Sequence, residues 1–194
     1  MIRLATWIDA PVERCFLLSL NVDLHIASAG STRERAIDGV TSGLIREGET
    51  VTFEGWHFGR RWSHTSLIDL MRLYSYYRDV MTAGVFEHFE HDHHFAVMDD
   101  GTRMRDEIRF SAPGGILGRL AETFVRRHLI AFLEERNAMI KRVAESQEWR
   151  RYLEDGVVSR VEAPAPAKTE TPRRWDGNAL LPTSPRIAVT RRNS

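Results

Sequence analysis

Histidine and acidic side chains gather in one short stretch of the sequence, HFEHDHHF, at residues 88–95. Imidazole rings can bind metal ions, transfer protons, titrate near neutral pH or form buried hydrogen bonds, and a neighbouring carboxylate assists each of these roles. Which role is open to this stretch depends on which side chains point the same way. That direction is set by the element that carries them.

A β-strand is the element that this stretch predicts, and side chains alternate between the two faces of a strand. Phe89 and Phe95 therefore share one face with His91 and His93. The other face carries the polar residues His88, Glu90, Asp92 and His94. Because the face with the aromatic residues is expected to face the core, His91 and His93 are the inward histidines, and the polar set is expected to face solvent.

The following strand adds an acidic residue to the inward face. Its alternation places Asp106 on the same side as Met104 and Ile108. A two-residue hairpin loop at 100–101 would put Phe95 opposite Asp106, and a four-residue loop at 98–101 would put His93 there. In either register His93 lies within about 5 to 8 Å of Asp106, Cβ to Cβ.

Four interpretations of His91, His93 and Asp106 are open. The three could bind a metal ion, with Asp106 as third ligand, or form a catalytic relay in which Asp106 orients His93 as a general base. A buried histidine could also act as a pH switch. We favour a fourth: the three satisfy one another and orient the polar end of a ligand, since buried polar groups need partners in any protein. We therefore expect no cofactor and no resident metal, and no catalytic residue is assigned.

The elements that must position these side chains follow an α+β order, with helices separated from the sheet along the chain. Residues 2–8 predict a first strand, Asp9-Ala10-Pro11 begins a short helix, and Asn21-Val22-Asp23 begins another. A run of strands is predicted from 43 to 112, including a pair around Glu47-Gly48-Glu49.

A long amphipathic helix is predicted from Leu117 to about Glu145. Phe124 and His128 lie on its apolar stripe, and we expect both to face the sheet. Charged residues, including Arg136, are expected to cover its outer face. A curved antiparallel sheet of about six to seven strands around this helix would bury the stripe and enclose a cavity.

Composition fits one folded domain followed by a tail. The 194 residues are 42% hydrophobic, and 27 basic residues balance 27 acidic ones, which argues against binding to nucleic acid or a membrane surface. The single cysteine, Cys15, excludes an internal disulfide and is predicted to be a buried structural thiol. We expect residues 1–150 to form the domain and residues 151–194, rich in Pro, Ala and Arg, a disordered tail whose protein partner is unknown. With no signal peptide and no membrane span, a cytoplasmic protein is expected.

Five blocks of sequence resemble the helix-grip or START-like superfamily, which includes polyketide cyclases, coenzyme-Q-binding proteins and plant lipid-binding allergens. The blocks are DAPVERCF, AIDGVTSGLIREGETVTFEGWHFG, AGVFEHFEHDHHF, DDGTRMRDEIRF and APGGILGRL. Within the superfamily they look like the bacterial SRPBCC branch labelled cell-division-inhibitor-like, over about residues 1–145. The resemblance implies a helix-grip fold and an internal cavity that binds or converts small hydrophobic molecules. It supplies no catalytic residues.

The sequence therefore predicts binding of a small hydrophobic molecule between a curved sheet and the C-terminal helix. The predicted ligand-binding residues are Phe89, His91, His93, Phe95, Met104, Asp106, Ile108, Phe124 and His128. One alternative is a polyketide-cyclase-like enzyme, namely a cyclase, dehydratase or isomerase, that uses His93 and Asp106. Another is a regulatory interaction protein, as the label of the branch suggests. We expect binding rather than catalysis.

Overall fold

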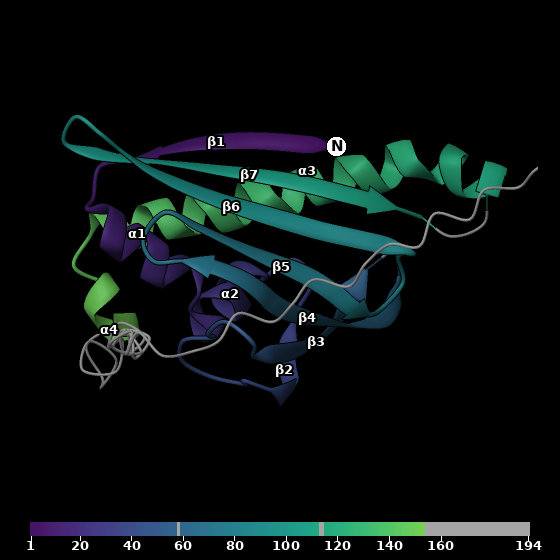
Figure 1. Cartoon of the computed structure of the whole chain (residues 1–194). Helices are drawn as coiled ribbons and strands as arrows, with labels where there is room; N and C mark the ends of the chain where they lie inside the picture. Colours follow the sequence, from purple (N-terminus) through teal and green to yellow (C-terminus); the bar gives the residue numbers. More distant parts are fainter. Residues whose placement is uncertain (58, 113–114, 154–194) are drawn as a thin grey trace, which may run out of the picture. The chain divides into compact units, whose positions relative to one another are not determined.

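A computed structural model of the protein describes residues 1–57, 59–112 and 115–153, without the side chains of residues 115–121. Strands and helices follow one another in the predicted α+β order (Figure 1). The elements are β1 (Ile2–Ile8), α1 (Val12–Ser19), α2 (Val22–Ser28), β2 (Arg35–Gly39), β3 (Thr50–His57), β4 (Arg60–Arg72), β5 (Tyr76–Ala83), β6 (His88–Met98), β7 (Gly101–Ser111), α3 (Gly115–Glu145) and α4 (Trp149–Leu153).

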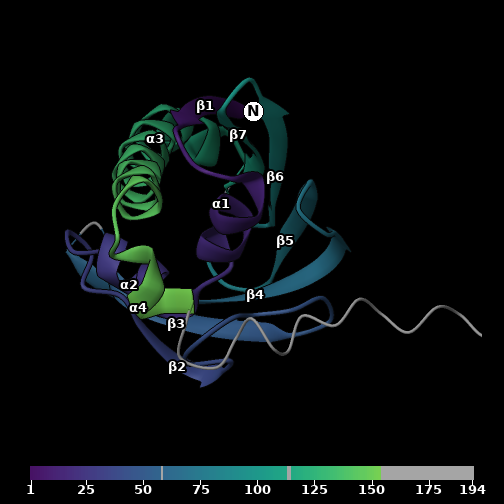
Figure 2. The same ribbon diagram turned by 90° about the vertical axis from the view of Figure 1, so that its left-hand side faces the viewer.

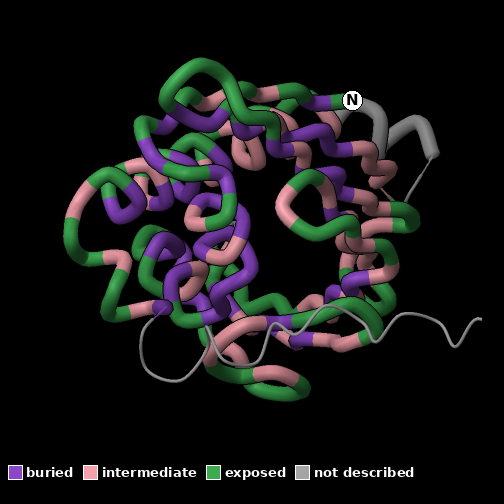
Figure 3. The backbone as a smooth tube through the Cα atoms, turned by 60° about the vertical axis from the view of Figure 1, so that its left-hand side comes forward, coloured by how far each residue is buried: buried purple, intermediate pink, exposed green. Residues whose placement is uncertain are grey.

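Seven strands form one antiparallel sheet in the order β1-β7-β6-β5-β4-β3-β2. Figure 2 shows the sheet curving around α3, with β1 and β2 at its two edges. Along β3 every second residue from Val51 to Gly55 is buried, and Figure 3 shows buried, intermediate and exposed residues interspersed along the chain. The predicted architecture, a curved antiparallel sheet around a long C-terminal helix, is confirmed.

One predicted strand is wrong. Residues 43–46 were expected to pair with β3 around Glu47-Gly48-Glu49, but their only ladder contact in the described chain is a single bridge between Asn21 and Leu44. The Gly48 N–H donates to the carbonyl of Ile68. The backbone groups of this loop therefore hydrogen bond to α2 and β4. The strand β3 pairs instead with β2.

The two short helices pack a core at one end of the sheet. Asn21 caps α2 through its side-chain oxygen, which accepts from the Leu24 N–H at 2.8 Å. Phe16 of α1 packs edge-on against Phe95 of β6, with ring centroids 5.3 Å apart. Cys15 is fully buried beside it, and burial raises the pKa of its thiol to about 11. The predicted burial of Cys15 is confirmed.

The helix α3 is confirmed, but its buried face differs from the predicted stripe. Leu133 and Arg136 are 3% and 5% exposed, whereas Phe124 is 64% exposed. Nine residues are about two and a half turns at 3.6 residues per turn, so Phe124 lies on the opposite side of the helix from Leu133. A run of i, i+4 steps drifts around the axis. Residues spaced alternately by three and four from Leu133 stay on one face of the helix. Arg136 and Ile140 lie on this face and point inward to the sheet.

None of the described helices combines the length and the hydropathy that crossing a membrane requires. Residues 154–194 lie outside the described residues, and they make up nearly all of the predicted tail, residues 151–194.

Candidate functional site

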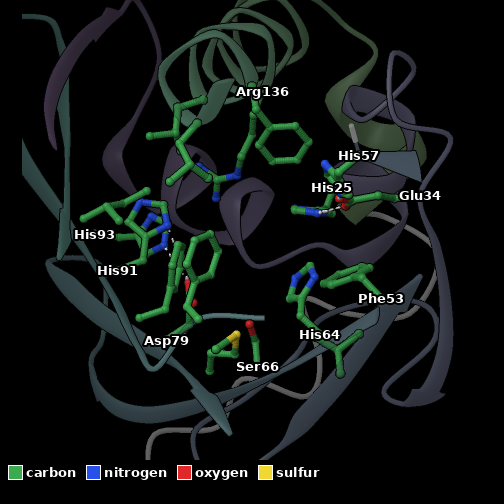
Figure 4. Close-up of a pocket in the computed structure, with 18 of the residues that line it drawn as sticks. His25, Glu34, Phe53, His57, His64, Ser66, Asp79, His91, His93 and Arg136 are labelled. Carbon is green, nitrogen blue, oxygen red and sulfur yellow. Dashed lines mark hydrogen bonds and ion pairs between the residues drawn. The ribbon is translucent and has the colours of Figure 1, made fainter. Parts of the chain in front are cut away.

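A cavity of about 320 Å³ lies between the concave face of the sheet and α3 (Figure 4). Apolar side chains form much of its wall, including Leu20, Ile45, Val51, Phe53, Ile68, Met81, Phe86, Phe89, Ile108, Leu129, Phe132 and Leu133. Six of the eight histidines also line it: His25, His57, His64, His91, His93 and His128. The polar groups form two clusters on opposite sides of the cavity, as Figure 4 shows.

The first cluster, called here the Asp106 cluster, consists of Asp79, His91, His93, Asp106 and Arg136. Strand register assembles it: His93 lies directly opposite Asp106 of β7, and His91 lies directly opposite Asp79 of β5. His91 and His93 face the concave side, as predicted, and are 6% and 1% exposed. Of the two predicted hairpin registers, the structure has the one in which His93 faces Asp106.

Each imidazole of the Asp106 cluster lies between the carboxylates of both neighbouring strands. The Nε2 of His91 is 2.9 Å from Asp106 Oδ1, and the Nε2 of His93 is 3.1 Å from Asp79 Oδ2. The other ring nitrogens also face carboxylates, since His91 Nδ1 is 3.7 Å from Asp79 Oδ2 and His93 Nδ1 is 3.0 Å from Asp106 Oδ1. Both hydrogen bonds are satisfied by neutral rings that carry the proton on Nε2.

One buried nitrogen is then left over. His93 Nδ1 is close to Asp106 Oδ1 but is not oriented to hydrogen bond to it, and it has no other hydrogen-bond partner among the described residues. Tyr77 stacks on the His93 ring with centroids 4.0 Å apart, and the tilted His91 ring lies against it with centroids 3.7 Å apart. The ring is held in place by stacking while this nitrogen lacks a partner, which is costly in a buried position.

The helix α3 contributes a cation and an amide to the Asp106 cluster. Arg136 donates to the Tyr77 hydroxyl and to the Ser19 carbonyl, both at 3.2 Å, and its guanidinium lies 3.7 Å from Asp106 Oδ1. Asn137 donates to the other Asp106 oxygen at 2.7 Å. The predicted outward position of Arg136 is therefore wrong, because the guanidinium balances carboxylates that the sheet buries.

Charge in the Asp106 cluster is unbalanced. Burial alone would raise the pKa of Asp106, but hydrogen bonding and charge from His91 and His93 hold that pKa well below its usual range. The pKa of Asp79 is lowered in the same way against its burial, chiefly by His93. Burial and the neighbouring His93 lower the pKa of His91, which favours its neutral form. Two carboxylates and one guanidinium leave a net charge of −1 when both rings are neutral.

The second cluster, called here the Glu34 cluster, consists of His25, Glu34, His57 and His128. Glu34 Oε2 lies 2.9 Å from His25 Nε2, and Glu34 Oε1 lies 3.2 Å from His57 Nε2. Because an ionised carboxylate only accepts, both Nε2 atoms carry protons. His57 Nδ1 then accepts from His128 Nε2 at 3.0 Å. A chain of hydrogen bonds thus links α3 to a buried carboxylate.

The chain brings Glu34 into this cluster through a loop that passes close to a strand. Glu34 precedes β2 and is 4% exposed. A Cβ on Gly55 of β3 would lie 2.6 Å from Glu34 Cγ, so the glycine leaves room for the Glu34 side chain in its present position. Burial alone would raise the pKa of Glu34, but hydrogen bonds from His25 and His57 lower it far below its usual value.

On the convex face, the polar residues of β6 are not all open to solvent. Asp92 is 5% exposed because the Tyr76 hydroxyl and the Arg109 guanidinium both bind its carboxylate. Arg109 also reaches Glu90 at 3.3 Å. The expectation of a solvent-facing set is therefore wrong for Asp92, whose cross-strand partners cover it.

The structure brings together some of the predicted ligand-binding residues and separates others. Five line the cavity, namely Phe89, His91, His93, Ile108 and His128. Asp106 lies behind His91 and His93 rather than in the lining. Phe95 and Met104 belong to the hydrophobic core. Phe124 is exposed and is not in the lining.

Several cavity residues were not predicted, and they differ in whether the sequence could have revealed them. Asp79 shares the face of Tyr77 and Met81 by strand alternation, so the period of two could have found it. Arg136 could have been found from the four-and-three spacing in α3. Glu34 lies outside any periodic element, and no local pattern marks it.

The arrangement supports two kinds of chemistry. The paired imidazoles and carboxylates can accept or donate hydrogen bonds to a polar group in the cavity. Asp79, His91 and His93 also offer one carboxylate oxygen and two imidazole nitrogens that lie within 4.8 Å of one another.

Comparison with known proteins identifies the fold. No family model matches the sequence, and no curated protein matches it. Solved structures do match. The protein TTHA0849 from Thermus thermophilus is 17% identical over 72% of this chain and 95% of its own, with a TM-score of 0.55. Ginseng major latex-like protein 151 from Panax ginseng is 11% identical over 75% of this chain and 97% of its own, with a TM-score of 0.51. At this identity the likeness shows the fold alone, which is the predicted helix-grip fold.

Proposed function

We propose that the protein binds a small, largely hydrophobic molecule in the cavity between the sheet and α3. The observation that carries this proposal is the cavity itself, about 320 Å³ with a largely apolar wall and two polar clusters. Ligand pockets are commonly about 300–1,000 Å³ and combine apolar walls with a few placed polar groups, so the ligand is at the small end of that range. The sequence blocks that resemble the bacterial START-like branch support the same proposal.

The polar residues of the cavity wall define what the ligand must carry. Asp79 and His91 can orient a hydroxyl, amine or similar polar group at one wall. His64 lies between the clusters and can contact a second polar group of the ligand. Burial is the main cause that lowers the pKa of His64, which favours a neutral ring that can accept a hydrogen bond. We expect an amphipathic ligand with polar groups that are separated by an apolar ring or chain.

Organic extraction of freshly purified full-length protein, followed by mass spectrometry, tests this proposal. We expect a stoichiometric small molecule, or saturable binding of at least one member of an apolar dye panel. No bound molecule together with no saturable dye site would contradict it.

A second candidate is an enzyme of the cyclase, dehydratase or isomerase kind that uses His93 and Asp106. The close contacts between imidazoles and carboxylates in the cavity wall favour it, because such pairs serve as general acids and bases. In that case His93→Ala and Asp106→Asn would abolish turnover while ligand affinity stays within about tenfold, or about 1.4 kcal/mol. An equal loss of turnover and affinity would favour binding alone.

A further inference from the structure

We propose that Asp79, His91 and His93 form a binding site for a divalent transition-metal ion in the wall of the cavity, with Asp106 as the outer carboxylate that orients both histidines. This inference does not depend on the ligand proposal. It departs from the sequence interpretation, in which Asp106 was the third ligand and no metal was expected.

The ligand atoms have suitable spacing. A tetrahedral zinc ion with bonds of about 2.0–2.1 Å holds its ligand atoms roughly 3.3–3.4 Å apart. Asp79 Oδ2 lies 3.1 Å from His93 Nε2 and 3.7 Å from His91 Nδ1, which brackets that value. In the described part of the chain this is the one group of histidine, cysteine or acidic residues whose three ligand atoms all lie within 4.8 Å of one another.

The outer contacts fit a metal site as well. A metal-binding histidine usually donates its second ring N–H to a carboxylate or a carbonyl. If His91 binds the ion through Nδ1, its Nε2–H donates to Asp106 Oδ1 at 2.9 Å. If His93 binds through Nε2, its proton moves to Nδ1, which lies 3.0 Å from the same oxygen. Asp106 would then serve both rings.

An ion would also give a role to the nitrogen that has no hydrogen-bond partner. Without an ion, His93 Nε2 donates to Asp79 and His93 Nδ1 is buried without a partner. With an ion, Nε2 becomes a ligand and the proton moves to Nδ1, 3.0 Å from Asp106 Oδ1, where a hydrogen bond forms once the ring or the carboxylate turns from its present orientation. The His93 ring neither gains nor loses a proton, because the proton only moves from Nε2 to Nδ1.

Charge and position favour the same conclusion. The Asp106 cluster brings two carboxylates, those of Asp79 and Asp106, against the single guanidinium of Arg136, and this excess of carboxylates attracts a cation. Asp79 is the most exposed of the three ligands, at 17% of its side chain, and it lines the cavity. A fourth coordination position is therefore expected to face the cavity. Two imidazoles, one carboxylate and an open position suit Zn²⁺ or Fe²⁺.

Calorimetric titration of chelator-treated, full-length protein with Zn²⁺ tests the inference. We expect one ion per chain. Asp106→Asn should weaken binding by about 10–100-fold, the usual effect of losing an outer carboxylate, and Asp79→Asn and His91→Ala should weaken it more. His94→Ala is the matched control, since it removes a histidine from the convex face of the same strand and should change the affinity less than about twofold.

Two results would overturn the inference: no binding of Zn²⁺ to the wild-type chain, or equal binding by wild type, Asp79→Asn and His91→Ala. If those variants do not fold, the visible spectrum of the wild-type chain with Co²⁺ decides. Intense bands of a four-coordinate ion support the site, and the weak spectrum of hydrated Co²⁺ contradicts it.

Discussion

The Asp106 cluster and the Glu34 cluster face each other across one cavity but are built in different ways. Three adjacent strands supply both imidazoles and both carboxylates of the Asp106 cluster, so strand register fixes their geometry. The Glu34 cluster takes its members from α2, a loop, β3 and α3. The first is anchored by the sheet, and the second depends on tertiary packing.

The two clusters also differ in charge. Glu34 is a single carboxylate that accepts from two histidine N–H groups. One arrangement of protons satisfies every ring nitrogen that takes part in these hydrogen bonds. The Asp106 cluster has two carboxylates and a ring nitrogen that lacks a partner. A satisfied network rigidifies a wall, whereas an unsatisfied one indicates a group that binds something. We therefore expect the Asp106 cluster to bind the polar part of a ligand or an ion, and the Glu34 cluster to shape the opposite wall.

The largest expected effect comes from Arg136, which compensates the carboxylates of the Asp106 cluster. Arg136→Met should lower the free energy of unfolding by about 3–5 kcal/mol, because it leaves Asp106 buried without its cation. Urea denaturation measures this. Arg142→Met, on the exposed side of the same helix, is the control and should stay within about 0.5 kcal/mol. Equal effects of the two changes would mean that Arg136 does not support the cluster.

Glu34→Gln should have a smaller effect, about 1–3 kcal/mol at pH 7, because two histidine donors lose an ionised acceptor. The folded pKa of Glu34 lies below its ordinary value of 4.5, so its contribution is fully present above that pH and is lost as pH falls toward the folded pKa. The difference in stability between wild type and variant should therefore shrink below about pH 4.5. Urea denaturation of both proteins from pH 7 down to about pH 3 checks this, with a constant difference expected above about pH 4.5.

A difference that stays constant from about pH 4.5 down to about pH 3 would show that the pKa of Glu34 is not lowered in the folded protein. A difference that grows as pH falls would contradict the assignment of protons in the Glu34 cluster.

The smallest expected effect comes from Gly55→Ala, which crowds the Glu34 side chain. The new methyl group would meet Glu34 Cγ at 2.6 Å, and overpacking of this kind costs about 1–3 kcal/mol, at the low end where a flexible side chain can move. Gly30→Ala is the control, because the nearest atom to its added methyl group is 4.0 Å away. Thermal denaturation compares the two. If the loss at Gly55 is the same in a Glu34→Ala background, the contact with Glu34 is not its cause.

The difference between the clusters also explains how much the sequence could predict. Strand alternation correctly placed His91, His93 and Asp106 on the concave side, because a period of two is local and regular. It could have found Asp79 by the same rule. The predicted apolar stripe of α3 was wrong for Phe124 and Arg136, because residues spaced i, i+4 drift around the helix axis. Glu34 reaches its histidines only through tertiary packing beside Gly55, which no local pattern encodes.

Most strands along the chain were predicted for the same reason. The hairpin of β6 and β7 has regular alternation and an evident turn, and it was placed correctly. The strand at 43–46 was misplaced because its composition suits a strand while its backbone groups bind Asn21 and neighbouring elements instead. Local preference gave way there to tertiary contacts.

The most direct test of the central claim, that the cavity binds a small hydrophobic molecule, is a fluorescence titration with an apolar dye on a variant whose cavity is filled. Ser66 is a buried residue of β4 that lines the cavity, and Ser66→Trp places a large side chain there. Ser75→Trp, on an exposed turn, is the matched control. We predict saturable binding of one dye per chain to the wild type and to Ser75→Trp, and loss of that binding in folded Ser66→Trp. Unchanged binding by folded Ser66→Trp would contradict the claim.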